Sequence, residues 1–192
     1  ASEAISYNEL HKRVNKFANV LKSKGIKKGD RVCIYLPMIP ELAISVLACA
    51  RIGAIHSVVF AGFSATALAS RINDCDCKML ITSDGGYRGA KTIDLKSIAD
   101  EALLDCDGIE SVLVAQRLYS NIPMVQDRDF WLQPLLDSAS DICEATVMDA
   151  EDPLFILYTS GSTGQPKGMV HTTAGYMVYA AYSFKNIFQY EP

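Results

Sequence analysis

The first periodic segment of the chain predicts an amphipathic helix. Ser6 and Glu9 have the spacing of a capping box, and Gly25 supplies a stop signal at the far end. Between these signals, apolar residues recur three and four positions apart, so that they share one face of a helix. These residues are Leu10, Val14, Phe17, Ala18 and Leu21.

Short apolar runs rich in β-branched residues then alternate with helical segments. The runs lie at residues 31–36, 54–60, 78–83 and 111–115. Pro40 starts and Gly53 ends one intervening helix, Ser64 caps the next, and the segment 94–105 reads as a third. Strands that recur at roughly 25-residue intervals with helices between them are typical of βαβ units. We therefore expect an α/β fold, with a mainly parallel sheet and helices on both faces.

Composition narrows the possible partners. The 192 residues are 49% hydrophobic and carry a net charge of −4, which is ordinary for a globular protein with a real core. Bulk electrostatics thus give nucleic acid or an anionic membrane no special attraction, and we expect neither as a partner. No run approaches the ~20 apolar residues needed to cross a bilayer.

The six cysteines predict free thiols. Cys33 and Cys49 lie in apolar runs, where a thiol acts as a small apolar side chain. Only Cys75 and Cys77 have the spacing of metal ligands, and neither a second pair nor a nearby histidine completes a zinc site. Free thiols and the lack of a secretion signal favour the cytoplasm as the location of the protein.

The chain opens without Met, almost directly in a helix, so we expect a piece excised from a longer protein.

The segment 159–168, TSGSTGQPKG, is the strongest candidate for binding chemistry. Its glycines allow backbone N–H groups to converge on an oxyanion, while its hydroxyls and Lys167 add donors and a positive charge. This combination suits a polyphosphate. Pro166 and Gly168 break the Walker pattern, and no dinucleotide fingerprint occurs. A flexible Ser/Gly hairpin loop is the alternative, which the apolar run before the segment and the PKG after it disfavour.

A second basic segment follows the strand predicted at residues 78–83. Arg88 and Lys91 lie among glycines at the carboxyl end of that strand, where ligands gather in parallel sheets. An anion site and a solvated loop both remain open here.

Three other features predict structural roles only. We expect the basic turn at residues 22–30 to be solvated. We expect His56 to be a satisfied sheet residue, and Trp131 to pack against a helix.

Beyond these local patterns, YTSGSTGQPKG resembles the phosphate-binding signature of adenylate-forming enzymes, which include acyl-CoA synthetases, luciferases and peptide-synthetase adenylation domains. Residues 29–82 closely resemble acetyl-CoA synthetases, and the resemblance covers essentially the whole chain. It implies an acid–thiol ligase that joins acetate to ATP, releases pyrophosphate, and then transfers the acetyl group from acetyl-AMP to CoA. A propionyl- or other short-chain acyl-CoA synthetase, and a nucleotide-binding module without chemistry, are the alternatives.

The resemblance also assigns residues to substrates. Contacts to the ATP phosphates are implied for Thr159, Ser160, Gly161, Ser162, Thr163, Gly164 and Lys167. Contacts to CoA are implied for Arg88, Gly89, Ala90 and Lys91. Lys167 would give electrostatic support to the departing pyrophosphate, and no catalytic residue is implied within the chain. Mg²⁺ would shield the phosphates, but no carboxylate here is an evident metal ligand.

By the same resemblance, residues 1–192 belong to the N-terminal large AMP-binding domain. We expect a βαβ subdomain at residues 1–117, a connection and helix at 118–150, with a flexible stretch at 118–129, and the phosphate-loop segment at 151–192. The adenine pocket, the acyl pocket and the C-terminal lid domain with its adenylation lysine are missing. The isolated chain should therefore be inactive, and its oligomeric state is open.

Overall fold

A mainly parallel sheet organises the computed structural model, which describes residues 3–160 and 166–189. The strand order is β7-β6-β3-β1-β2-β8-β9, and every neighbouring pair is parallel except β8 and β9. The strands are β1 (Arg31–Ile34), β2 (Ile55–Val58), β3 (Met79–Ser83), β6 (Ser111–Ala115), β7 (Asp129–Trp131), β8 (Pro153–Thr159) and β9 (Lys167–Thr172). The α/β fold that the sequence predicts is confirmed.

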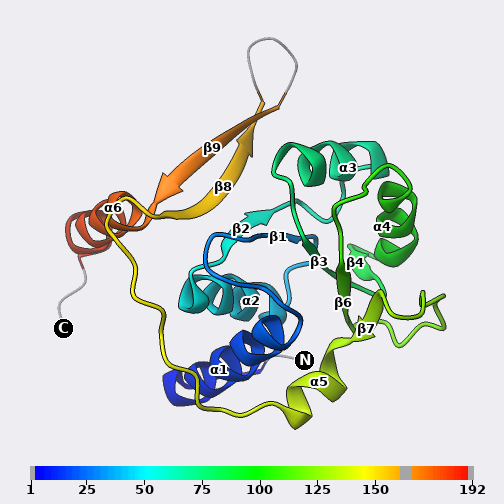
Figure 1. Cartoon of the computed structure of the whole chain (residues 1–192), viewed down its shortest axis with the longest axis horizontal. Helices are drawn as coiled ribbons and strands as arrows, with labels where there is room; N and C mark the ends of the chain where they lie inside the picture. Colours follow the sequence, from blue (N-terminus) through cyan, green and yellow to red (C-terminus); the bar gives the residue numbers. More distant parts are fainter. Residues whose placement is uncertain (1–2, 161–165, 190–192) are drawn as a thin grey trace.

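Helices cover both faces of the body of this sheet (Figure 1). One face carries α1 (Tyr7–Ser23), α2 (Pro40–Ile52) and α5 (Leu132–Ser138), and the other carries α3 (Ala65–Asp74) and α4 (Leu95–Leu103). Alternate residues of the strands feed two separate cores. In β1, for example, Val32 and Ile34 pack toward α1 and α2, while Cys33 packs toward α3 and α4. Burial on both faces explains why the strands read as continuous apolar runs.

The helix boundaries follow the expected capping residues. The Ser6 hydroxyl accepts a hydrogen bond from the Glu9 backbone N–H at 3.2 Å, and Ser64 caps α3 in the same way. Gly53 ends α2 with φ at +72°, a backbone conformation that glycine adopts without strain. The capping box at α1 is only half formed, because the Glu9 carboxylate binds Arg13 at 2.7 Å instead of returning to Ser6.

The connection expected at residues 118–129 has no helix or strand before Asp129, which opens β7. Buried carboxylates fasten both of its ends. Asp84, directly after β3, accepts backbone hydrogen bonds from residues 117, 118 and 120. Asp129 is paired with Lys96 at 2.8 Å and with Arg128 at 2.6 Å. Burial alone would raise the pKa of Asp129, but the hydrogen bonds from Arg128 and Lys96 outweigh it and lower the pKa.

Strands β8 and β9 and helix α6 (Thr173–Asn186) leave this body as a projecting arm (Figure 1). No residue of α6 is buried, and large apolar side chains are exposed along the arm. They include Leu157, Met169, Val170, Tyr176, Met177, Val178, Tyr179, Tyr182, Ile187 and Phe188. Within the described ranges, no helix is long and apolar enough to span a membrane.

Candidate functional site

Both candidate binding segments follow the carboxyl ends of parallel strands. The basic segment begins after β3 and the Ser/Gly-rich segment begins after β8, and parallel pairing puts these ends on one edge of the sheet. Strands β1 and β2 lie between β3 and β8, so the two segments follow strands that are not neighbours in the sheet.

The basic segment forms a second, two-stranded sheet. Strand β4 (Gly86–Arg88) pairs antiparallel with β5 (Lys91–Ile93), and Arg88 lies directly opposite Lys91. Gly89 and Ala90 make the turn between them, and Gly89 takes a positive φ of +63°, which favours glycine. The structure thus brings all four residues predicted to bind CoA together at the exposed tip of one hairpin.

Residues that the sequence interpretation did not single out hold this hairpin in place. A Cβ atom on Gly85 would lie 2.7 Å from the Ile93 carbonyl oxygen and 2.5 Å from Leu118, so only glycine fits there without a shift. Neighbouring Asp84 binds the turn at residues 117–120. The sequence signal that could have identified Asp84 and Gly85 is an Asp followed by two glycines at the end of a predicted strand.

Arg88 also reaches toward the turn that follows β2. A Cβ atom on Gly62 would lie 3.6 Å from Nη1 of Arg88, so the guanidinium lies beside that turn. Because β2 is the strand next to β8, this contact brings a predicted CoA residue toward the strand that carries the Ser/Gly-rich segment.

The Ser/Gly-rich segment closes an antiparallel hairpin between β8 and β9. Thr159 and Lys167 form its last cross-strand pair, and both are exposed, as is Ser160. The structure therefore puts the predicted cation opposite the predicted hydroxyl at the base of the loop. Of the other predicted phosphate contacts, Gly161, Ser162, Thr163 and Gly164 lie outside the described residues.

Tyr158 and Gly168 form the next cross-strand pair below the loop. A Cβ atom on Gly168 would lie 3.2 Å from the Tyr158 ring and 3.1 Å from Ile156, tighter than most side-chain contacts. The glycine of the PKG triplet therefore leaves room for the aromatic ring across the hairpin. The sequence alone gives no reason for the last residue of this triplet.

Strand β8 is joined to the body through β2. The register pairs His56 with Phe155, and their rings stack with centroids 5.5 Å apart. Phe155 in turn stacks on His171 of β9 at 4.4 Å and meets Tyr176 of α6 edge-on at 5.1 Å. An aromatic column therefore runs from the body through both strands of the arm to α6.

His56 differs from the satisfied sheet residue that we expected. It is 6% exposed, and its buried Nδ1 has no hydrogen-bond partner among the residues that the structure describes. Burial lowers the pKa of His56 to about 4, because a charged imidazolium would lose its hydration. His56 is therefore neutral near pH 7 and acts as a stacking partner of the arm.

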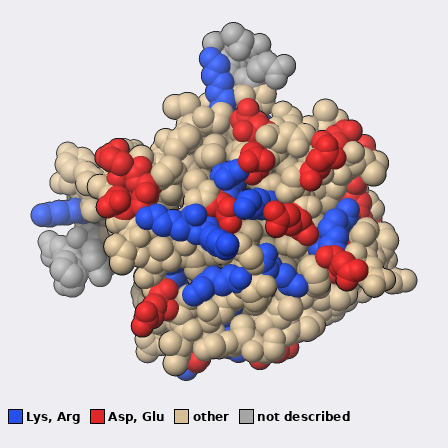
Figure 2. Space-filling model, viewed as in Figure 1, with Lys and Arg blue, Asp and Glu red and all other residues tan. Residues whose placement is uncertain are grey.

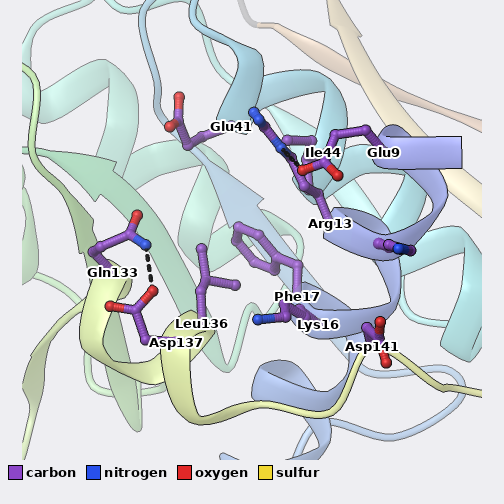
Figure 3. A pocket seen from close by; sticks show the side chains of 11 residues that line it. Glu9, Arg13, Lys16, Phe17, Glu41, Ile44, Gln133, Leu136, Asp137 and Asp141 are labelled. Atoms are coloured by element: carbon purple, nitrogen blue, oxygen red, sulfur yellow. Dashed lines mark hydrogen bonds and ion pairs between the residues drawn. The ribbon is translucent and has the colours of Figure 1, made fainter. Parts of the chain in front are cut away.

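A hollow of about 510 Å³ lies between α1, α2 and α5 (Figure 3). Phe17, Ile44 and Leu136 contribute apolar lining, and charged side chains surround them. Arg13 in its wall is already bound by Glu3 and Glu9, both at 2.7 Å. None of the predicted site residues lines this hollow, so its size alone does not make it the site of chemistry.

Charged side chains of both signs are interspersed over the face seen in Figure 2, without a large patch of one sign there.

All six cysteines are buried free thiols, and burial raises the pKa of Cys49 to about 12. In the part of the chain that the structure describes, no group of three His, Cys, Asp or Glu residues is placed to hold a metal. Trp131 packs partly buried against the core under α3 and α4.

This chain combines a mainly parallel sheet with a Ser/Gly-rich hairpin at the carboxyl edge, and one class of protein matches it over its whole length. The profile of that class, described as AMP-binding enzyme, matches residues 1–192. The chain belongs to the AMP-binding enzyme family.

Particular relatives are similar over nearly the whole chain. Acetyl-coenzyme A synthetase of Saccharophagus degradans is 55% identical, and acetyl-coenzyme A synthetase 2 of Pseudomonas aeruginosa 57%, each over 98% of this chain. The solved structure of acetoacetyl-CoA synthetase from Streptomyces lividans superposes with a TM-score of 0.91 at 26% identity, covering 99% of this chain and 29% of that one. The chain spans 29% of the length of the two acetyl-coenzyme A synthetases.

The buried His56 generates a testable pH dependence. Its folded pKa of about 4 lies below the usual value of 6.5, so the unfolded chain binds more protons between these limits. The stability that this group contributes is therefore complete above pH 6.5 and falls as the pH drops toward 4. We expect a loss of about 3 kcal/mol over this window, from 1.36 kcal/mol per pKa unit.

Urea unfolding at pH 7 and pH 4 measures this loss. His56→Gln should remove most of this histidine's share of the pH dependence, because glutamine does not titrate. His11→Gln, at an exposed histidine on α1, should leave it intact. An unchanged pH dependence in His56→Gln would contradict the prediction.

Proposed function

We propose that the full-length protein is an ATP-dependent acetate–CoA ligase. The observation that carries the proposal is the hairpin that puts Lys167 opposite Thr159 at the carboxyl edge of the sheet, within a chain more than half identical to acetyl-coenzyme A synthetases. The basic hairpin at Arg88 and Lys91 on the same edge adds a place for a second phosphorylated substrate.

In the first step, a carboxylate oxygen of acetate attacks the α-phosphorus of ATP, and the bond to the leaving pyrophosphate breaks. Thr159, Ser160 and Lys167 would hold the β- and γ-phosphates, with the segment 161–164 completing the cradle. Negative charge grows on pyrophosphate as it departs, and the Lys167 ammonium offsets that charge without transferring a proton. Mg²⁺ enters with ATP as its counter-ion, and we assign it no protein ligand within this chain.

In the second step, the sulfur of CoA attacks the acetyl carbonyl carbon of acetyl-AMP, which releases AMP and forms the thioester. Arg88, Gly89, Ala90 and Lys91 would contact the nucleotide phosphates of CoA. The planar Arg88 guanidinium can bind a phosphate through two parallel hydrogen bonds, whereas Lys91 offers a point charge. Opposite positions on one hairpin let both cations face the same phosphate group.

We further propose that residues 1–117, 118–150 and 151–192 are successive parts of the large AMP-binding domain of this ligase. The chain alone would not turn over, because it spans 29% of the length of those two relatives and lacks an assigned adenine pocket, acyl pocket and lid. The buried free thiols support a reducing compartment, and the cytoplasm stays our expectation.

The proposal is tested by supplying the full-length protein with ATP, CoA and acetate. We expect AMP, pyrophosphate and acetyl-CoA in equal amounts. Propionate and butyrate in parallel reactions separate an acetate-specific ligase from a broader short-chain enzyme. Absence of acetate-dependent AMP would remove the proposal.

Lys167→Ala in the full-length protein should slow adenylation by about 100-fold, the typical effect of deleting one preorganised charge-stabilising donor. Acetate-dependent exchange of labelled pyrophosphate into ATP measures this step by itself. Lys22→Ala removes the same charge from the exposed surface of α1 and should leave exchange unchanged. Equal exchange rates in Lys167→Ala and the wild type would contradict the role.

Arg88→Ala should raise the KM for CoA by about 10-fold, as expected for the loss of one charge-assisted contact, and should leave pyrophosphate exchange unchanged. Arg88→Lys keeps the charge but loses the planar fork, so its KM should fall between those of the wild type and Arg88→Ala. An effect confined to ATP would show that this hairpin does not serve CoA.

A further inference from the structure

Tyr158 connects the base of the Ser/Gly-rich loop to the body of the protein. It directly precedes Thr159, the last residue of β8. Its hydroxyl donates a hydrogen bond to the Asp74 carboxylate and lies 3.1 Å from the Cys75 thiol. Both partners belong to the carboxyl end of α3, so one side chain joins the arm to a helix of the body.

Asp74 stands in an unusual place for an acidic residue. It is the last residue of α3, where the partial negative charge of the helix end disfavours a carboxylate. The Tyr158 hydroxyl compensates by donating a charge-assisted hydrogen bond, which is stronger than one between neutral groups. Burial, followed by the hydrogen bond to Asp74, raises the pKa of Tyr158, so the phenol keeps the proton that it donates.

The ring of Tyr158 is held as well as its hydroxyl. Gly168 faces one side of the ring from across the hairpin. The guanidinium of Arg71 lies 5.3 Å from the ring centroid, and also lies 4.7 Å from the Phe63 ring. Arg71 is 9% exposed, and it donates a hydrogen bond to the Ala67 carbonyl within α3. The ring therefore sits between a fixed cation and the β9 backbone.

Tyr158 lies next to both ends of the loop. Thr159 follows it in the chain, and Lys167 precedes its cross-strand partner Gly168. The register between β8 and the body pairs His56 with Phe155, three residues earlier, and β9 pairs with β8 alone. Within the described residues, Tyr158 is thus the last side chain hydrogen-bonded to the body before the loop begins.

We propose that Tyr158 and Asp74 form an anchor that positions Thr159 and Lys167, at the two ends of the loop, for the phosphates of ATP. Both are positioning residues, because they act through Thr159 and Lys167 and not by touching the reacting atoms. The inference deepens the proposed function and rests on its assignment of the loop to ATP.

Tyr158→Phe in the full-length protein removes only the donating oxygen. We expect the Kd for ATP and the KM for ATP in pyrophosphate exchange each to rise about 10-fold, the scale on which losing a hydrogen bond to a charged group acts. Formation of acetyl-CoA from supplied acetyl-AMP and CoA should stay unchanged. Tyr7→Phe deletes the same oxygen from a side chain that is 90% exposed and should change nothing.

Asp74 variants test the pair. Asp74→Ala should match Tyr158→Phe, and the double variant should be no worse than either, since both remove one interaction. Asp74→Asn keeps an acceptor for the phenol and should restore most of the ATP affinity. Unchanged ATP binding in Tyr158→Phe overturns the anchor, and so does an equal fall of both half-reactions together with a lower melting temperature.

Failure of the proposed function is a separate result. If the wild type shows no acetate-dependent pyrophosphate exchange, the acetate assignment fails. Titration of the wild type and the two variants with ATP alone still decides the anchor, because ATP binding needs no acid substrate.

Discussion

The parallel pairing of β8 with β2 is the contact on which the position of the candidate ATP site depends. It extends the carboxyl edge of the body to the strand that leads into the Ser/Gly-rich loop. In the body, helices bury both faces of the sheet, and two cores fix every strand. Helix α6 has no such cover among the described residues, and the arm is joined to the body by a few contacts. They include the stack of His56 on Phe155, the bond between Tyr158 and Asp74, and the ion pair of Lys28 with Asp152 at 2.6 Å.

The body could be predicted from sequence because its signals are local. Ser6 and Ser64 mark the starts of two helices, because each side chain caps a backbone N–H three residues later. Gly53 marks the end of a helix through its own left-handed backbone conformation. The apolar runs indicated where the strands lie, because a strand that is buried on both faces has few polar positions. The Ser/Gly-rich segment could be singled out as a candidate phosphate loop for a related reason, since the residues that suggest this chemistry are consecutive.

What escaped prediction depends on contacts between distant residues. Tyr158 and Asp74 are 84 positions apart, and the sequence around either residue does not predict its contact with the other. An acidic residue at the end of a helix was the one local sign that a donor was needed. His56 is a buried sheet residue as expected, but the missing partner of its Nδ1 among the described residues and its stack on Phe155, which lies 99 positions away, are not revealed by the local pattern of β2.

The two proposed phosphate sites lie on one edge of an acidic protein, so two anionic ligands would have to bind on the same side of the sheet. Strands β1 and β2 lie between the strands that carry them, so the two proposed sites do not begin on neighbouring strands. A continuous set of side chains still joins them. Arg88 lies beside the turn at Gly62, Phe63 of that turn packs on Arg71, and Arg71 covers Tyr158. If the two sites bind as proposed, this set of side chains connects them along one edge of the sheet.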